Sequence, residues 1–178
     1  QWSSSAASDV YKRQLKHDKK AVDEVQQFID DLRYRVKGIK ENASNIGTNM
    51  HSLCEDYITG KNPIEPTTEP LKTMFNKFKK FWKKRNFEIV ETEKTYYSDE
   101  LDVCGTLDVL VKRKGKIGIL DFKTSKDFYP DMPVQIHTYK KLVEDSTKHK
   151  IEFLAVINIP KEPVKDVSIR FFDIKPRY

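Results

Sequence analysis

The segment from Gly105 to Lys126 constrains the fold most strongly, because it has the pattern of a tight β-hairpin. Two runs of mainly apolar residues flank the pair Lys114-Gly115, and glycine is favoured in the two-residue turns of hairpins. A hairpin with this turn pairs Asp108 with Asp121, and the Cβ atoms of directly paired residues lie about 4.5–5.5 Å apart. The sequence therefore predicts two carboxylates face to face on neighbouring strands.

The two faces of the predicted hairpin carry different kinds of residue. Side chains alternate between the faces of a strand, so Lys123 shares the face of Asp121 and is expected opposite Thr106. The other face carries apolar pairs and is expected to be core: Leu107 with Phe122, and Val109 with Leu120.

Two opposed carboxylates repel each other, and burial increases the repulsion. A divalent cation removes the conflict, because hard cations such as Mg²⁺ prefer carboxylate oxygens. A solvated charge cluster and a pair of acids sharing one proton are the alternatives. The D-x-K spacing alone carries no weight, since it occurs three times, but only Asp121–Lys123 has an acid predicted opposite it: the others are Asp18–Lys20 and Asp173–Lys175.

Periodicity predicts helices before and after this hairpin and further strands around it. The first helix carries an apolar stripe formed by Val22, Val25, Phe28/Ile29, Leu32, Val36 and Ile39. The predicted helices span 19–41, 48–59, 71–85 and 133–146, and the predicted strands span 87–97, 101–113, 116–124, 151–159 and 167–174. This order predicts an α/β (α+β) fold with one mixed sheet and helices on its faces.

The ends of the chain are interpreted separately from the fold. Residues 1–14 resemble translated adapter sequence or a disordered tail, so we expect one domain over 15–178, truncated near its C-terminus. Composition narrows the partners only broadly. The net charge of +6, from 33 Lys+Arg and 27 Asp+Glu, is compatible with a polyanionic partner without identifying one. No apolar run approaches the length that spans a membrane.

Four motifs in order resemble those of a known enzyme superfamily. The motif G-T-L-D, followed by D-F-K-T-S, resembles the PD-(D/E)XK nucleases, and specifically the RecB-like exonuclease branch. That branch includes mitochondrial genome maintenance exonucleases and related phage and bacterial exonucleases. "GTNMHSLCEDY" resembles its helical histidine motif and "QIHTY" its Q-x-x-x-Y helix. The resemblance covers about residues 46–143 and implies a three-layer α-β-α sandwich with a central mixed β-sheet and a restriction-endonuclease-like core.

The resemblance also implies roles for individual residues. It assigns Asp108, Asp121 and Lys123 to catalysis, and His51, Asp108, Asp121 and the Phe122 backbone carbonyl to the metal. Gln135 and Tyr139 would position the substrate. Further candidates are Glu55, Glu93 and Thr124 beside the metal ligands, and Lys79, Lys83 and Lys126 as phosphate contacts. For Glu55 and Glu93, an ordinary role as surface or salt-bridge residues is an equally good interpretation.

The resulting expectation is a metal-dependent deoxyribonuclease, most simply an exonuclease acting on single-stranded DNA or DNA ends in repair, recombination or replication. The cofactor would be one or two Mg²⁺ or Mn²⁺ ions. An iron–sulfur cluster needs more cysteines than Cys54 and Cys104, which are expected in the core. A catalytically silent nucleic-acid-binding module and a restriction-type endonuclease are the alternatives. The resemblance favours a bacterial or phage cytoplasmic protein, leaves a mitochondrial one open, and leaves the oligomeric state undetermined.

Overall fold

The computed structural model describes the backbone of residues 4–175 and the side chains of residues 19–37 and 41–175. Its elements, in chain order, are α1 (Ser4–Ile58), α2 (Leu71–Lys83), β1 (Glu88–Ser98), β2 (Val103–Arg113), β3 (Lys116–Lys123), α3 (Asp131–Ser146), β4 (Phe153–Asn158) and β5 (Ser168–Phe172). The chain divides into two compact units, residues 1–45 and residues 46–178. The unit that holds the sheet begins at Ile46.

The N-terminal helix is longer than the sequence predicts. Helix α1 is continuous from Ser4 to Ile58, whereas the sequence predicts two helices with a break between 41 and 48, and an irregular tail over 1–14. Of that tail, residues 4–14 are helical and residues 1–3 lie outside the described part. Gly47 lies within this continuous helix and has a tertiary reason to be small. A Cβ atom at Gly47 would lie 3.2 Å from Thr124 Oγ1, so the glycine lets α1 approach the end of β3.

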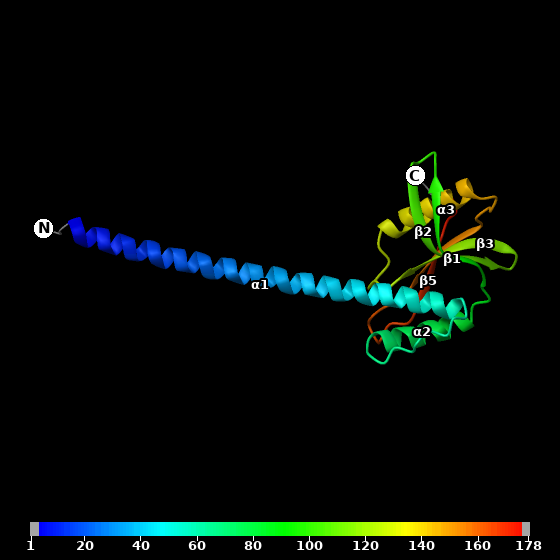
Figure 1. Cartoon of the computed structure of the whole chain (residues 1–178), viewed down its shortest axis with the longest axis horizontal. Helices are drawn as coiled ribbons and strands as arrows, with labels where there is room; N and C mark the ends of the chain where they lie inside the picture. The colour runs from blue at the N-terminus through cyan, green and yellow to red at the C-terminus, as the bar shows by residue number, and fades with distance from the viewer. Residues whose placement is uncertain (1–3, 176–178) are drawn as a thin grey trace. The chain divides into compact units, whose positions relative to one another are not determined.

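All five strands form one mixed sheet in the order β1-β2-β3-β4-β5. The first three strands form an antiparallel meander, β3 and β4 are parallel, and β5 is antiparallel to β4. The parallel connection runs through α3, as parallel strands require. In Figure 1, α3 lies on one side of the sheet, and α2 and the end of α1 lie on the other. The predicted α/β sandwich with a central mixed sheet is confirmed.

The β2–β3 hairpin has the predicted turn and register. Lys114 and Gly115 both have positive φ, 51° and 81°, as the two-residue turn requires. Paired residues run from Arg113 with Lys116 to Val109 with Leu120. The pairing stops there, one residue before Asp108 and Asp121. The predicted backbone pairings of Asp108 with Asp121 and of Thr106 with Lys123 are therefore wrong, because both lie beyond the last pair of the β2–β3 ladder.

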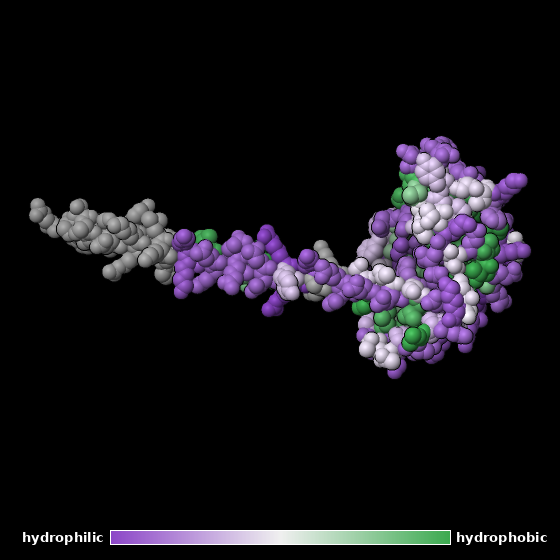
Figure 2. Space-filling model, viewed as in Figure 1, coloured by the Kyte–Doolittle hydropathy of each residue, from purple (hydrophilic) through white to green (hydrophobic). Residues whose placement is uncertain are grey.

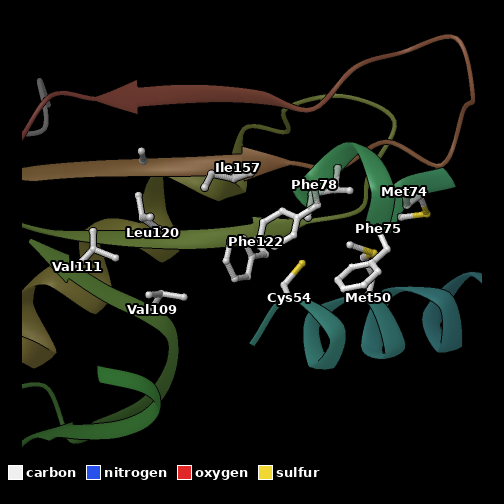
Figure 3. Packing of buried hydrophobic residues seen from close by; sticks show 12 residues of the cluster. Met50, Cys54, Met74, Phe75, Phe78, Val109, Val111, Leu120, Phe122 and Ile157 are labelled. Carbon is white, nitrogen blue, oxygen red and sulfur yellow. The ribbon is translucent and has the colours of Figure 1, made fainter. Parts of the chain in front are cut away.

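Two apolar clusters, one on each face of the sheet, hold the layers together. Figure 3 shows the first, where Met50 and Cys54 of α1 and three residues of α2 pack against the strands: Met74, Phe75 and Phe78. The second cluster joins α3 to the opposite face and includes Leu110, Ile119, Ile136, Leu142 and Val156. The outer surface in Figure 2 is mainly hydrophilic with scattered apolar groups.

The two clusters correct one prediction about the hairpin. Phe122, Val109 and Leu120 belong to the first cluster as expected, but Leu107 belongs to the second. Leu107 and Phe122 therefore do not share a face. The regular alternation of β2 is lost between Leu107 and Val109, which is where pairing with β3 ends. This irregularity centres on Asp108.

The cysteines occupy different environments. Cys54 is buried in the core as expected, whereas Cys104 is exposed, so the prediction that both are core residues is wrong for Cys104. Cys104 lies near the start of β2, whereas the β2 residues that belong to the two apolar clusters lie further along the strand. Within the part of the chain that the structure describes, no helix has the length and apolarity needed to cross a bilayer.

Gly118 provides a test of the packing between β3 and β4. A Cβ atom at this position would lie 2.4 Å from ring atoms of Phe153. We expect Gly118→Ala to lower the free energy of unfolding by about 1–3 kcal/mol in urea titrations, because the ring must move out of a packed position. The control is the pair Gly118→Ala/Phe153→Ala. In this double variant the added cost of the alanine at 118 should largely disappear, and additive effects would contradict the clash.

Candidate functional site

At the open end of the hairpin, where backbone pairing between β2 and β3 has ended, the Asp108 side chain bonds to β3 instead. Its Oδ2 accepts a hydrogen bond of 2.6 Å from the backbone N–H of Phe122. The carboxylate thereby reaches from β2 to β3 at the point where the ladder ends. The Asp108 side chain thus accepts the hydrogen bond of the Phe122 N–H, and this bond holds Asp108 beside the residue that follows Asp121. The sequence's prediction that the two acids lie near each other therefore has a structural basis, although the backbone pairing differs.

Asp121 is the most deeply buried acid of the site. Only 2% of its surface is exposed. Its Oδ2 lies 2.8 Å from Lys123 Nζ, and its Oδ1 accepts a hydrogen bond of 3.1 Å from the same amine. The buried Oδ2 therefore has an ion-pair partner in Lys123 but accepts no well-aligned hydrogen bond. An acceptor-only oxygen in this state has room in its coordination for a cation.

The electrostatics of Asp121 reflect burial and a nearby like charge. Burial, followed by the charge of Asp108, raises the pKa of Asp121 to about 6, although Lys123 and then His51 act in the opposite direction. The neighbouring ammonium therefore does not fully compensate the two carboxylates. This is the charge conflict predicted from the hairpin, and an additional cation would relieve it.

His51 comes to the site from α1. Its Nδ1 lies 3.6 Å from Asp108 Oδ1, a contact longer than a hydrogen bond. Its ring also meets the Phe122 ring edge to face, with centroids 6.2 Å apart. Burial lowers the pKa of His51, but Asp108, and to a lesser degree Asp121, outweigh burial and raise it above its ordinary value. The predicted convergence of His51 with the hairpin acids is thus present in the structure.

A hollow of about 360 Å³ lies beside His51 and Asp108. Gly47, Thr48 and Glu93 complete its lining. Glu93 has a φ of 47°, which is unusual for a non-glycine residue within a strand and turns its side chain out of the regular alternation of β1. Burial, then Asp108 and then Glu55, raise the pKa of Glu93. Glu93 is exposed to solvent and also lies within the field of the acids of the site.

The other sequence candidates fall at different distances from this centre. Gln135 Nε2 donates a hydrogen bond of 2.9 Å to Tyr139 Oη, which joins the two residues of the Q-x-x-x-Y motif. Burial, and then the charges of Asp121 and Asp108, raise the pKa of Tyr139, so this phenol lies within their field. A Cβ atom at Gly105 would lie 3.0 Å from the Tyr139 ring, which explains the glycine of G-T-L-D.

Glu55 and the phosphate-contact candidates are less central. Glu55 lies 3.5 Å from Lys61 in an ion pair. Lys79 is held 2.6 Å from Glu65 and its amine lies over the Phe75 ring, so its charge is already paired. Lys83 and Lys126 are exposed.

One buried polar residue near the site escaped the sequence analysis. Asn158 ends β4, is 4% exposed and pairs with Lys123 in the parallel register. Its Oδ1 lies 3.4 Å from the Ser125 hydroxyl. The sequence feature that could have identified Asn158 is its position as the polar residue that ends the apolar run of β4. Asn158 connects the strand of Lys123 to the loop that follows it.

The donor set fits a hard cation in part. Asp108 and Asp121 provide the oxygen ligands that Mg²⁺ and Mn²⁺ prefer, and the buried Oδ2 of Asp121 accepts no well-aligned hydrogen bond. Among the residues that the structure describes, no three His, Cys, Asp or Glu side chains gather closely enough to form a metal-binding group. The chain matches no protein-family model, and a search of curated proteins finds no significant match.

The raised pKa of Asp121 predicts a pH-dependent effect of replacing it. A raised carboxyl pKa favours the protonated form in the folded protein, so the stability from this group is present at low pH and is lost as the pH rises through about 6. In chelator, Asp121→Asn should raise the free energy of unfolding at pH 8 by about 1–3 kcal/mol relative to wild type. The gain should shrink below about pH 5, whereas exposed Asp99→Asn should change little at any pH. A gain at Asp121 that does not vary with pH would contradict this assignment.

Proposed function

We propose that this protein is a divalent-metal-dependent nuclease of the PD-(D/E)XK type that hydrolyses phosphodiester bonds of DNA. The observation that carries the proposal is the meeting of Asp108, Asp121 and Lys123 at the open end of one hairpin, where a buried carboxylate oxygen has an ion-pair partner but no well-aligned hydrogen bond. His51 from α1 and Tyr139 from α3 border the same acids. The order of these residues along the chain agrees with the four motifs of the RecB-like exonucleases.

In this proposal, Asp108 and Asp121 hold one or two Mg²⁺ or Mn²⁺ ions, with His51 and the Phe122 carbonyl as further ligands. A bound divalent cation would polarise the phosphate and lower the pKa of water. The hydrogen bond from Phe122 N–H orients Asp108, and the contact with Lys123 orients Asp121. The other oxygen of Asp108, Oδ1, lies 3.6 Å from His51 Nδ1 and takes no part in that hydrogen bond.

Lys123 has a second task in the proposed reaction. Its side chain is 24% exposed, while that of Asp121 is almost completely enclosed, so Lys123 has contact both with the acid and with solvent. As an ammonium it would orient the attacking water and offset the negative charge that develops on the phosphate, and it would help to deprotonate that water once it has released its own proton to solvent. Gln135 and Tyr139, joined by their hydrogen bond, would hold the scissile phosphate or an adjacent base.

The first test is the metal-dependent hydrolysis of end-labelled DNA. Asp108→Ala, Asp121→Ala and Lys123→Ala should each reduce the rate by at least about 100-fold, because each removes a group that acts on the reacting atoms. Circular dichroism should confirm that the variants remain folded. The matched control is Asp173→Ala, which alters the D-x-K sequence beyond β5 and should cost little. Lys123→Ala with a near wild-type rate would contradict the mechanism.

The choice of DNA substrate separates the proposed exonuclease from its alternatives. The same preparation is tested on single-stranded linear, duplex linear and covalently closed circular DNA. Preference for free ends, especially single-stranded ends, is expected from the histidine and Q-x-x-x-Y motifs. Efficient cutting of closed circles, with linear DNA no better, would favour a restriction-type endonuclease. Binding of DNA without cleavage in either metal would favour the catalytically silent module.

Metal preference tests the role of His51. An imidazole nitrogen is a borderline ligand that Mn²⁺ tolerates better than Mg²⁺, so wild type should reach half-maximal activity at a lower concentration of Mn²⁺. His51→Ala should weaken metal dependence and narrow the gap between the two ions, while Ca²⁺ should occupy the site with poor turnover. Titrations of both proteins decide the matter. Identical Mn²⁺ and Mg²⁺ curves in wild type and variant would mean that His51 only contacts Asp108.

A further inference from the structure

A hollow of about 520 Å³ lies between the end of α2 and the loop that joins β4 to β5. Figure 1 shows this loop beside α2. Lys77 holds it there, because its amine donates hydrogen bonds to the carbonyl oxygens of Pro163, at 2.6 Å, and Lys165. Besides Lys77, the hollow is lined by Lys80, Phe81, Lys84, Arg85, Asp166 and Val167. None of these residues lines the hollow beside His51 and Asp108.

The hollow has an excess of positive charge. Four cations and one acid line it, and the acid, Asp166, is 95% exposed and lies 3.9 Å from the Lys77 amine. Among the residues that the structure describes, no acid forms an ion pair with Lys80, Lys84 or Arg85. Like charges that surround one hollow repel each other, and an anion bound between them would relieve that repulsion.

Arg85 is held by packing rather than by a carboxylate. Its guanidinium carbon lies 4.5 Å from the centroid of the Phe81 ring, and its Nε is enclosed without a hydrogen-bond acceptor. The backbone N–H of Arg85 donates to the carbonyl oxygen of Trp82 at 2.8 Å, which fixes Arg85 to the end of α2. A guanidinium in a fixed position suits a phosphate, because it stays charged and presents several N–H donors.

The hollow lies at the end of the sheet that carries the candidate site. Lys123 of β3 pairs with Asn158 of β4, which pairs with Ser168 of β5, the residue after Val167. Two strand spacings, about 10 Å, therefore separate Lys123 from Ser168. Val167 also packs against the apolar cluster that contains Phe122, on the face of the sheet that α1 covers. A single extended ligand can thus reach both the hairpin acids and the hollow.

We propose that this hollow binds phosphates of the DNA strand whose scissile phosphate lies at Asp108 and Asp121. The identity of the polyanion rests on the proposed function, whereas the position of the hollow and the sign of its charge do not. Lys80 and Lys84 supply charges on flexible stems, and Arg85 supplies a fixed one. Contacts with phosphates position a strand without reading its sequence, so the hollow sets the affinity for DNA rather than the chemical step.

The test is the salt dependence of binding to a labelled single-stranded oligonucleotide, measured by fluorescence anisotropy in chelator so that no cleavage occurs. Lys80→Gln/Lys84→Gln should lower the slope of log affinity against log salt by about 1.4, because each lost phosphate contact removes about 0.7. Binding should weaken about 20-fold at about 0.1 M salt.

The matched control is Lys148→Gln/Lys150→Gln. It removes the same charge from two exposed lysines that precede β4, at the opposite end of the sheet. This control should keep nearly the wild-type affinity and slope. An equal loss in the control would mean that only the net charge of the protein matters, and it would overturn the proposal. So would a free mononucleotide that competes as well as the oligonucleotide, because a strand must span the hollow and the acids.

Urea titrations of the same proteins separate binding from stability, since cations near the C-terminal end of a helix also stabilise that helix. Lower stability of Lys80→Gln/Lys84→Gln with unchanged affinity would overturn the proposal. If wild type cleaves DNA and this variant binds and cleaves it equally well, the hollow is excluded and the nuclease stands. Binding that depends on the hollow without any cleavage would support the hollow and count against the nuclease. Absence of DNA binding by wild type would overturn both.

Discussion

The hydrogen bond from the Phe122 backbone N–H to the Asp108 carboxylate is the contact on which the candidate site depends. It occurs where regular pairing between β2 and β3 ends, and it substitutes a side-chain acceptor for a backbone carbonyl. The hairpin is thereby held together while its strands stop exchanging ladder hydrogen bonds. Because the acceptor is charged, the bond is stronger than an ordinary backbone pairing and fixes the acid in place. It also keeps Asp108 near the buried Asp121.

The layers of the fold bring the remaining side chains to this hairpin end. Glycines occupy two of the closest approaches, with Gly47 of α1 beside Thr124 and Gly105 of β2 beside Tyr139. A larger residue at either position would press directly on its neighbour. Small residues at these two contacts allow α1 to present His51 on one face of the sheet and α3 to present Tyr139 on the other. The candidate site therefore lies where the two apolar clusters end.

The same region contains features that are unfavourable for stability. Asp121 is buried with a raised pKa, Glu93 has a positive φ in a strand, and Asp121 Oδ2 accepts no well-aligned hydrogen bond. Features that lower stability in this way are expected where a protein binds or transforms a ligand, because they contribute nothing to the packing of a core. Their coincidence at one hairpin end supports the proposed function more strongly than any one of them. The remainder of the sheet follows ordinary packing, with apolar residues enclosed on both faces.

The sequence by itself determined the local parts of this protein. Lys114-Gly115 specifies the turn, and the apolar alternation specifies the register from Arg113 to Val109, because turn geometry and side-chain period are local properties. It also predicted the succession of helices and strands along the chain and the nearness of Asp108 and Lys123 to Asp121. Tertiary structure decided the rest. The continuity of α1 through Gly47, the separation of Leu107 from Phe122, the exposure of Cys104 and the burial of Asn158 depend on which element packs against each position. Such contacts join residues far apart in the chain, and no local pattern encodes their distances.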